Sequence, residues 1–396
     1  MSGPLDEVIA DAPDHSGGPG VGKPLTVLQT ISAEHFNAAA RSVREIAGAV
    51  ATAGGRSLIA ASGAAAARVR AAGSDLTLMD FASRRRASAA LSELAAETGA
   101  DIIHTHDPVS AEAALVAAKA TGAHLITTFH TPPASGWRTV LSRPAMYQAD
   151  RAIVVSDALA GEVIGRHGLT LDRLTTIPRG ADMDIYAEEV VSAHRTIALA
   201  DALGLDEDPR PVVLTMGQIT KQSGHRTLVQ AVANGVGADA LFLLVGDDAD
   251  GAGAALEAEI VAAGLGGVFR RADRVEDTPA ALKLASLVCE VSPSYGGQVL
   301  IEAQAMGRPV IAPDAGAAPS VMDDRSSGWL FPVGDGQALQ QVLTEALAMD
   351  ESARAHIGMA GRARVRSSFT LSVMLSATLD VYEATLGKPF RPVKTF

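Results

Sequence analysis

A glycine-rich loop before a helix is the segment of the sequence best suited to hold an anion. The apolar run ending at Val291 predicts a buried strand, Pro293 to Gly297 form a tight loop, and Gln298 to Met306 predict a helix. The first N–H groups of a helix lack partners within it and lie at the positive end of the helix dipole. The loop therefore suits a diphosphate. We expect Glu302 on the helix to be exposed to a cleft between two domains, where it could accept hydrogen bonds from both hydroxyls of a ribose.

Imidazoles close two strand-like runs in the first half of the chain. His104 and His106 lie in the run DIIHTH, which Asp107 follows, and His130 ends the run HLITTFH. Ligands of parallel sheets bind at the carboxyl ends of strands, so His106 and His130 could hydrogen-bond a hydroxyl of a sugar or of an acceptor. The alternative is that both are polar strand-end residues bonded to nearby loops. We expect His104 on the sheet face opposite to His106, in a structural role.

These groups must be positioned by two series of strand-like runs, each alternating with helical stretches rich in alanine. The first series comprises residues 26–31, 56–62, 76–81, 101–106, 124–130, 152–156 and 174–178. The second comprises residues 211–217, 240–246, 267–271, 286–292, 308–313 and 328–332. Such alternation is typical of parallel sheets covered by helices on both faces. The fold class is therefore α/β, with two doubly wound parallel-sheet domains.

The two series also divide the chain into parts. Residues 1–24 are rich in Gly, Pro, Asp and Ser and lack apolar periodicity, which predicts a flexible tail. We expect one domain over residues 25–185, a junction over residues 186–207 and a second domain over residues 208–368. Residues 369–396 contain a terminal helix with apolar residues on one side.

The composition indicates a globular protein of a reducing, cytoplasmic compartment. The chain has 396 residues and a net charge of −12, which argues against nucleic acid as a partner. One cysteine, Cys289, excludes an intramolecular disulfide. No apolar run reaches the roughly 18 residues of a membrane-spanning helix. The basic run Arg84 to Arg86 is either a solvated helix start or a contact with anionic lipid at the inner face of the membrane.

Six segments resemble, in the same order, the bacterial members of glycosyltransferase family 4. They lie within residues 26–387 and are DIIHTHD, ITTFH, AIVVS, IPRGAD, VLTMG and EAQAMGRPVIA. The resemblance implies the GT-B architecture, in which Rossmann-like domains face each other across a cleft and the last helix returns to the first domain. It also implies transfer of a sugar from a nucleotide sugar to a glycan or lipid-linked acceptor, with retention of the anomeric configuration.

The resemblance further implies which residues form the site. The catalytic candidates are His106, Asp107 and His130. The donor-binding candidates are Gly217, Gln218, Lys221, Ser223, Ser294, Gly297, Gln298, Val299 and Glu302. No cofactor is implied, and no metal is expected because the sequence lacks a cluster of Cys and His at ligand spacing.

Several of these positions lack the charged side chain that the family carries. Of the two glutamates expected eight positions apart, Glu302 matches the second, whereas Ser294 stands at the first. Gln218 and Ser223 stand where related enzymes have an arginine and a lysine. These charges would stabilise the leaving diphosphate, so their loss predicts weak binding of the donor and slow turnover.

Two functions are therefore left open. The first is an active transferase, in which Lys221 and Arg226 could compensate for the missing charges. The second is a pseudo-glycosyltransferase that scaffolds or activates an active partner, in which Lys221 and Arg226 are solvated. Further losses favour the second function, since Ser320 replaces a glutamate and the segment after the first strand has no glycine. An active glycosyltransferase or a second copy of the chain is then the expected partner.

Overall fold

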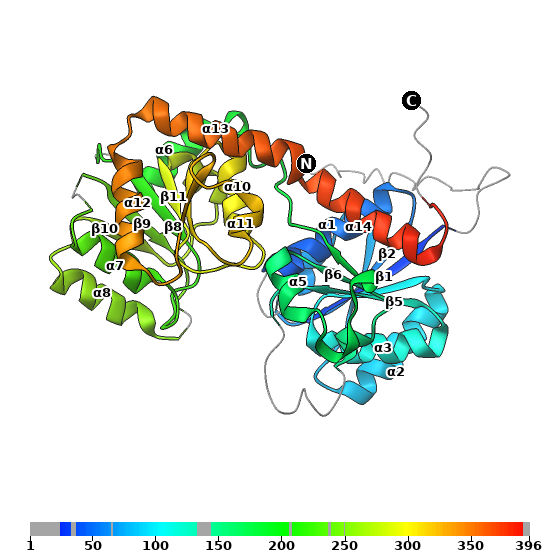
Figure 1. Cartoon of the computed structure of the whole chain (residues 1–396). Helices are drawn as coiled ribbons and strands as arrows, with labels where there is room; N and C mark the ends of the chain where they lie inside the picture. Colours follow the sequence, from blue (N-terminus) through cyan, green and yellow to red (C-terminus); the bar gives the residue numbers. More distant parts are fainter. Residues whose placement is uncertain are drawn as a thin grey trace, which may run out of the picture.

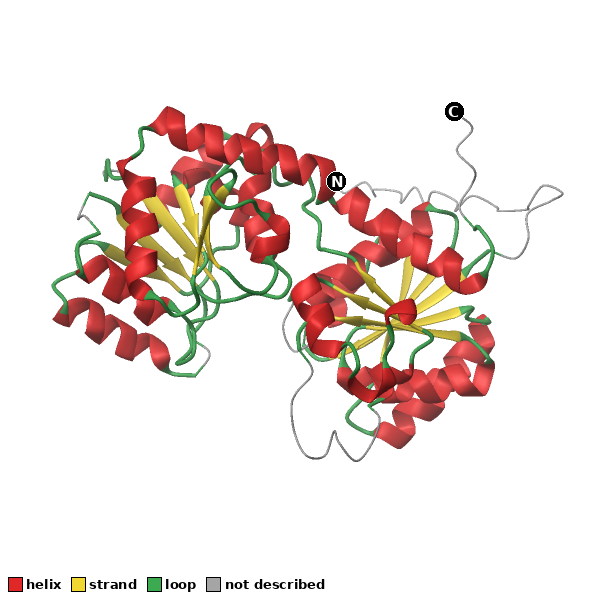
Figure 2. Cartoon of the chain, viewed as in Figure 1, coloured by secondary structure: helices red, strands yellow, loops and turns green. Residues whose placement is uncertain are grey.

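The chain folds into two α/β domains, each with one parallel sheet between layers of helices (Figure 2). The computed structural model describes residues 24–32, 37–64, 66–132, 144–205, 208–236, 239–248 and 250–390. The predicted tail lies, except for Pro24, outside the described residues. All thirteen predicted strand-like runs overlap a strand, which confirms the predicted fold class. The buried apolar residues that predicted the strands fill both faces of each sheet.

The first domain has a seven-stranded sheet in the order β3-β2-β1-β4-β5-β6-β7. Its strands are β1 Thr26–Ser32, β2 Arg56–Ser62, β3 Ser74–Leu78, β4 Ile102–Thr105, β5 His124–Phe129, β6 Arg151–Val154 and β7 Leu174–Thr176. Its helices are α1 Ala38–Thr52, α2 Arg84–Thr98, α3 Pro108–Thr121 and α5 Asp157–Val163. Short 3-10 turns occur at η1 Ala66–Val69, η2 Ala145–Gln148, η3 Arg166–Gly168 and η4 Leu171–Arg173.

The second domain has a six-stranded sheet in the order β10-β9-β8-β11-β12-β13. Its strands are β8 Val212–Met216, β9 Leu241–Val245, β10 Phe269–Ala272, β11 Leu287–Cys289, β12 Val310–Pro313 and β13 Gly328–Phe331. Its helices are α7 His225–Ala233, α8 Ala252–Ala262, α9 Thr278–Leu284, α10 Gln298–Ala305, α11 Ala318–Val321, α12 Gly336–Ala348 and α13 Glu351–Ser368. Along the chain, η5 Glu188–Val190 and α6 Ala193–Ala202 come between the strands of the first sheet and those of the second.

The last helix, α14 Leu371–Leu386, follows α13 and lies over the first domain (Figure 1). Its buried side chains Met374, Leu379 and Tyr382 belong to the apolar cluster that includes Val27 of β1 and Ile126 of β5. The apolar side of the helix thus covers one face of the first sheet. The first domain is therefore built from two pieces of the chain.

The two segments that connect the domains are hydrogen-bonded to each other. The N–H of Ala181 donates to the carbonyl of Phe369 at 2.9 Å, and the N–H of Leu371 donates to the carbonyl of Ala181 at 2.8 Å. Gly180 is required for this approach, because a Cβ there would lie 2.4 Å from the carbonyl oxygen of Thr370. Any change in the angle between the domains must therefore move both segments together.

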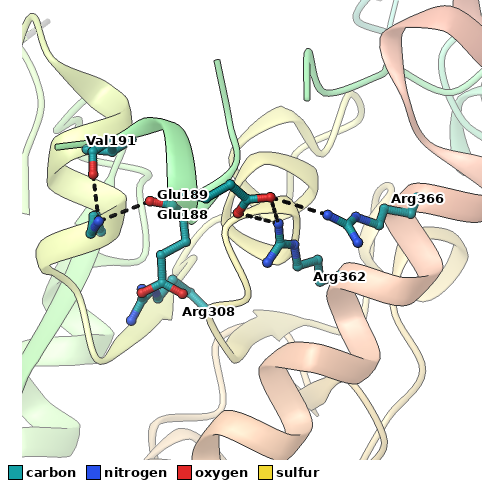
Figure 3. A network of polar contacts seen from close by, with 7 residues as sticks. Glu188, Glu189, Val191, Arg308, Arg362 and Arg366 are labelled. Atoms are coloured by element: carbon teal, nitrogen blue, oxygen red, sulfur yellow. Dashed lines mark hydrogen bonds and ion pairs between the residues drawn. The ribbon is translucent and has the colours of Figure 1, made fainter. Parts of the chain in front are cut away.

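The junction after Ala181 is fixed to the second domain by ion pairs (Figure 3). Glu189 pairs with Arg362 at 2.5 Å and with Arg366 at 3.4 Å, both on α13, and Glu188 pairs with Arg308 at 2.5 Å. The Nζ of Lys283 donates to the backbone carbonyls of Glu188 and Val191. Residues 188–191 therefore belong mechanically to the second domain.

Candidate functional site

The predicted anion loop is present at the N-terminus of α10. Gly297 precedes the helix with φ 58°, a left-handed conformation that favours glycine, and no side chain caps the helix. The hydroxyl of Ser294 accepts the N–H of Gly297 at 3.2 Å, and its carbonyl accepts the N–H of Ala317 at 2.8 Å. Ser294 therefore shapes the loop, and no side chain among the described residues accepts a hydrogen bond from the first N–H groups of α10.

Glu302 is buried, so the prediction that its carboxylate is exposed to a cleft is wrong. Its side chain is 3% exposed and forms an ion pair with Arg41 of α1 in the first domain. The Nε2 of Gln298 donates to the same carboxylate at 2.8 Å and to the carbonyl of Gly180 at 3.4 Å. The error arose because helix α1 of the other domain covers this face of α10. Glu302 thus holds the two domains together in this conformation.

Arg179, which lies after β7 in the segment IPRGAD, is a site residue that sequence reasoning missed. It is 4% exposed, and its Nη1 donates to the carbonyl of Ala38 at 2.8 Å and to the hydroxyl of Ser42 at 3.0 Å. Its Nη2 lies 2.8 Å from Nδ1 of His130. A Cβ at Gly296 would lie 2.6 Å from its Nε, so the guanidinium touches the anion loop. The available signal was the one basic residue in the segment IPRGAD.

Burial lowers the pKa of Arg179 to about 10, so the guanidinium is charged at neutral pH. Burial also opposes the charge of Arg41, yet the nearby carboxylate of Glu302 leaves the pKa of Arg41 above its ordinary value. Burial, followed by the charge of Glu302, raises the pKa of the neighbouring phenol of Tyr186. Two permanent cations of the first domain therefore lie beside the anion loop of the second.

The predicted catalytic histidines lie together, with both ring nitrogens of each in hydrogen bonds. Nδ1 of His106 lies 3.2 Å from Nε2 of His130, and Nε2 of His106 lies 3.1 Å from Oε1 of Gln29. Nδ1 of His130 contacts Arg179. His106 is 3% exposed. Neither ring offers a free nitrogen to a substrate in this conformation.

His104 lies on the same sheet face as His106, so the prediction of opposite faces is wrong. The ring centroids are 4.1 Å apart, because residues two apart in a strand point the same way. Nδ1 of His104 contacts the hydroxyl of Tyr382 at 2.7 Å, and Nε2 contacts the hydroxyl of Thr128 at 2.8 Å. Burial lowers the pKa of His104 to about 3. His104 thus joins α14 to the sheet, which is a structural role.

Asp107, the third predicted catalytic residue, caps α3. Its carboxylate accepts the N–H groups of Val109, Ser110 and Ser32 at 2.8–2.9 Å and the hydroxyl of Ser110 at 2.6 Å. Burial raises the pKa of this carboxyl despite these hydrogen bonds. All of its visible contacts are structural, as expected for an aspartate at a helix N-cap.

Among the described residues, no side chain of the loop after β8 forms an ion pair or hydrogen bond with the anion loop. Gln218 is exposed, and the hydroxyl of Ser223 donates to the carbonyl of Thr220 at 2.7 Å within a tight turn. Lys221 is exposed, and Arg226 pairs with Glu259 of α8 on the surface. Compensation by Lys221 or Arg226 therefore finds no support among these contacts.

Two further predicted donor residues are positioned by the backbone. Gly217 has φ 151° and a Cβ there would meet nothing within 4 Å, so the end of β8 is open. Val299 is partly buried and packs on the apolar cluster beneath α10. The predicted donor residues thus lie in the loop after β8, in the loop before α10 or on α10 itself. Among the described residues, only Gln298 and Glu302 of this set have side chains that bond to the first domain.

The described residues contain no group of three potential metal ligands. Among the described residues, no helix is long and apolar enough to cross a bilayer. A cavity of about 1090 Å³ lies behind the site, between α1, residues 181–184 and the start of α14. None of the predicted catalytic or donor residues lines it.

Glu45 on α1 gives a prediction about pH. Burial raises its pKa to about 7, although Arg41 and Arg179 oppose the shift. A raised carboxyl pKa costs stability as pH rises from about 4.5 to 7, because the unfolded chain loses this proton first. We expect Glu45→Gln to raise the free energy of unfolding by about 1 kcal/mol at pH 8 and to leave it unchanged near pH 4. The value is small because Glu45 is partly exposed and solvent screens its charge.

Urea denaturation at both pH values checks this expectation. Glu97→Gln, which removes an exposed carboxylate on α2, is the control and should show no such dependence. Equal stabilities of wild type and Glu45→Gln at pH 8 would contradict the role assigned to Glu45.

Comparison with protein families matches both domains. Residues 39–185 match the family described as Glycosyltransferase Family 4, and residues 210–349 match the family described as Glycosyl transferases group 1. Among curated proteins, the D-inositol 3-phosphate glycosyltransferase of Xylanimonas cellulosilytica is 29% identical over 74% of this chain and 74% of its own length. The alpha-maltose-1-phosphate synthase of Mycobacterium tuberculosis is 28% identical over 75% of this chain and 84% of its own length.

Solved structures share the fold. A glycosyltransferase from Rickettsia africae superposes with a TM-score of 0.81 at 20% identity, over 93% of this chain and 100% of its own. Anabaena Alr3699/HepE in complex with UDP and glucose superposes with a TM-score of 0.79 at 20% identity, over 91% of this chain and 100% of its own. The two parallel sheets are thus those of GT-B glycosyltransferases.

Proposed function

Because the chain belongs to glycosyltransferase family 4, we propose that it transfers a sugar from a nucleotide sugar to a glycan or lipid-linked acceptor at a donor site of altered charge. The reaction proceeds with retention of the anomeric configuration, at the cytoplasmic face of the membrane. The observation that carries the proposal is Arg179, a buried cation that touches the anion loop at Gly296.

The charge argument starts from the leaving group. A nucleotide diphosphate departs with growing negative charge, so cations and N–H donors must be aimed at it. The second domain supplies the N–H groups of α10, but Gln218 and Ser223 are neutral. Arg179 supplies a guanidinium from the junction. A cation and a helix N-terminus repel each other, and a diphosphate between them would be attracted to both.

Ribose binding requires a change at Glu302. The carboxylate is occupied by Arg41 and Gln298 in this conformation. The vicinal hydroxyls of a ribose can replace these donors, which leaves Arg41 free to contact the phosphates. In this proposal both arginines of the first domain replace the cations that the second domain lacks.

The first test is binding of the donor. Calorimetry with UDP and with GDP measures affinity for the diphosphate, and release of UDP from UDP-glucose measures turnover. UDP-glucose is the first donor to test because HepE was solved with it. Inositol 3-phosphate is the first acceptor, since it appears in the name of a relative. Absence of both binding and turnover would contradict the proposal.

A second candidate function is a catalytically impaired homologue that scaffolds or activates a partner, either an active glycosyltransferase or a second copy of the chain. One observation favours it: the ion pair with Arg41 occupies the carboxylate of Glu302 that a ribose would need. In that case Arg41 blocks the nucleotide rather than binding it.

Arg41→Ala distinguishes the two functions by the sign of its effect. We expect it to weaken UDP binding about 10-fold or more, because a charged hydrogen bond to phosphate is lost. If Arg41 blocks the site, the variant binds UDP more tightly than the wild type. Arg44→Ala, which removes an exposed arginine of the same helix, is the control for net charge. Calorimetry measures the affinities, and thermal unfolding shows whether the variants are folded.

A further inference from the structure

We infer that Gln29, His106 and His130 form a one-directional hydrogen-bond chain that aims Arg179 at the anion loop, and that both histidines are positioning residues rather than acid–base catalysts. The role of this hydrogen-bond chain in binding a diphosphate rests on the proposed function. The direction of its hydrogen bonds and the position in which it holds Arg179 do not depend on that function.

The direction of the chain follows from Arg179, whose side chain can only donate. Nδ1 of His130 must therefore accept, and a neutral imidazole then carries its proton on Nε2. That N–H donates to Nδ1 of His106. The proton of His106 is in turn on Nε2 and donates to Oε1 of Gln29. Each bond fixes the next, so both histidines are neutral Nε2–H tautomers.

Both ends of the chain are anchored in the first domain. The amide Nε2 of Gln29 donates to the carbonyl of Val43 at 3.0 Å, which also fixes the orientation of the amide. At the other end, Nη1 of Arg179 donates to Ala38 and Ser42. Gln29 is fully buried on β1. The chain thus links β1, the ends of β4 and β5, and the junction.

The chain cannot take up a proton without breaking. A proton on Nδ1 of His130 would face the N–H of Arg179, and one on Nδ1 of His106 would face the N–H of His130. Burial lowers the pKa of both histidines well below the usual value. The positive charge of Arg179 and the neighbouring His104 lower both pKa values further. The ring of His104 in turn contacts Tyr382 on α14.

The chain leaves one edge of Arg179 available. Within the described residues, Nη1 bonds to Ala38 and Ser42 and Nη2 to His130, whereas Nε–H donates no hydrogen bond. This Nε lies against Gly296 at the start of the anion loop. The Nε–H and a second N–H on Nη2 form a fork of the kind that binds phosphate oxygens. His130 therefore selects which edge of the guanidinium faces the ligand.

Two substitutions of His130 test its two hydrogen bonds one at a time. Asparagine places an acceptor near the position of Nδ1 and preserves the bond from Arg179, whereas glutamine reaches the position of Nε2 and loses it. We expect His130→Asn to bind UDP within about threefold of the wild type and His130→Gln to bind about 10-fold or more weakly. Equal losses of turnover in both variants, with unchanged UDP affinity, would overturn the inference in favour of acid–base catalysis.

Nitrogen-15 NMR of the full chain tests the direction without any nucleotide. We expect His106 and His130 to be Nε2–H tautomers that do not titrate between pH 5 and 8. Titration of either ring in this range, or a proton on Nδ1, would overturn the inference. If the tautomers are as expected but the wild type does not bind UDP, the hydrogen-bond chain is supported and the proposed donor site fails.

Discussion

Arg179→Ala is expected to lower the affinity for UDP about 100-fold or more. The substitution removes a forked, charge-assisted contact to the diphosphate, and each charged hydrogen bond contributes roughly 1.5–3 kcal/mol. The second domain cannot make up the loss, since Gln218 and Ser223 are neutral. Calorimetry with UDP, or competition against a fluorescent nucleotide where binding is weak, measures the change.

Arg179→Lys and Arg85→Ala complete this experiment. Lysine keeps the charge but not the fork, so its affinity should lie between those of wild type and alanine variant. Arg85 is exposed on α2, a helix that carries none of the site residues, and its loss should leave UDP binding unchanged. An Arg179→Ala variant that is folded and binds UDP like the wild type would remove Arg179 from the donor site.

Gly224→Ala is expected to destabilise the second domain by more than about 3 kcal/mol. A Cβ at Gly224 would lie 1.8 Å from the carbonyl oxygen of Val291, a backbone atom that cannot turn aside. The φ angle of −71° is ordinary, so the cost is steric and arises from the close approach of the two loops. That approach brings the loop after β8 beside the anion loop.

Chemical denaturation of the second domain, followed by its tryptophan fluorescence, measures this loss. Trp329 lies buried in β13 and reports on that domain. Gly267→Ala is the matched control, because a Cβ there meets nothing within 4 Å and its φ is not positive. If both variants unfold at the same denaturant concentration as the wild type, the loops are farther apart than described.

The fold could be predicted because its signals are local. The parallel strands are short, mostly apolar runs of three to seven residues, and the alanine-rich helices between them differ strongly in pattern. Boundaries were less exact: β3 spans Ser74–Leu78, whereas the prediction was residues 76–81, since the apolar run continues into the turn that follows. The helix predicted from Gln298 was found at Gln298–Ala305.

The site was harder to predict because its contacts join distant parts of the chain. Arg41 meets Glu302 across 261 residues, and Arg179 meets Ser42 across 137. No periodicity in either segment signals the other. From the sequence, a carboxylate near the start of a helix is expected to be exposed. Glu302 is buried because the other domain covers it, and nothing in its own segment indicates that contact. The arginines that we propose as replacements for the missing charges, Arg41 and Arg179, lie near α10 only because the fold brings distant segments together.

The first domain is built from two pieces of the chain that the second domain separates. This arrangement sets the order in which the two domains can finish folding during synthesis on the ribosome. Chain synthesis delivers the first sheet early, but the face that carries Val27, Ile102 and Ile126 is covered partly by α1 and partly by α14, which follows the second domain in the sequence. The second domain contains its own strands and can close its core while part of that face is still open. Folding of the domain synthesised first therefore finishes last, when Tyr382 reaches His104.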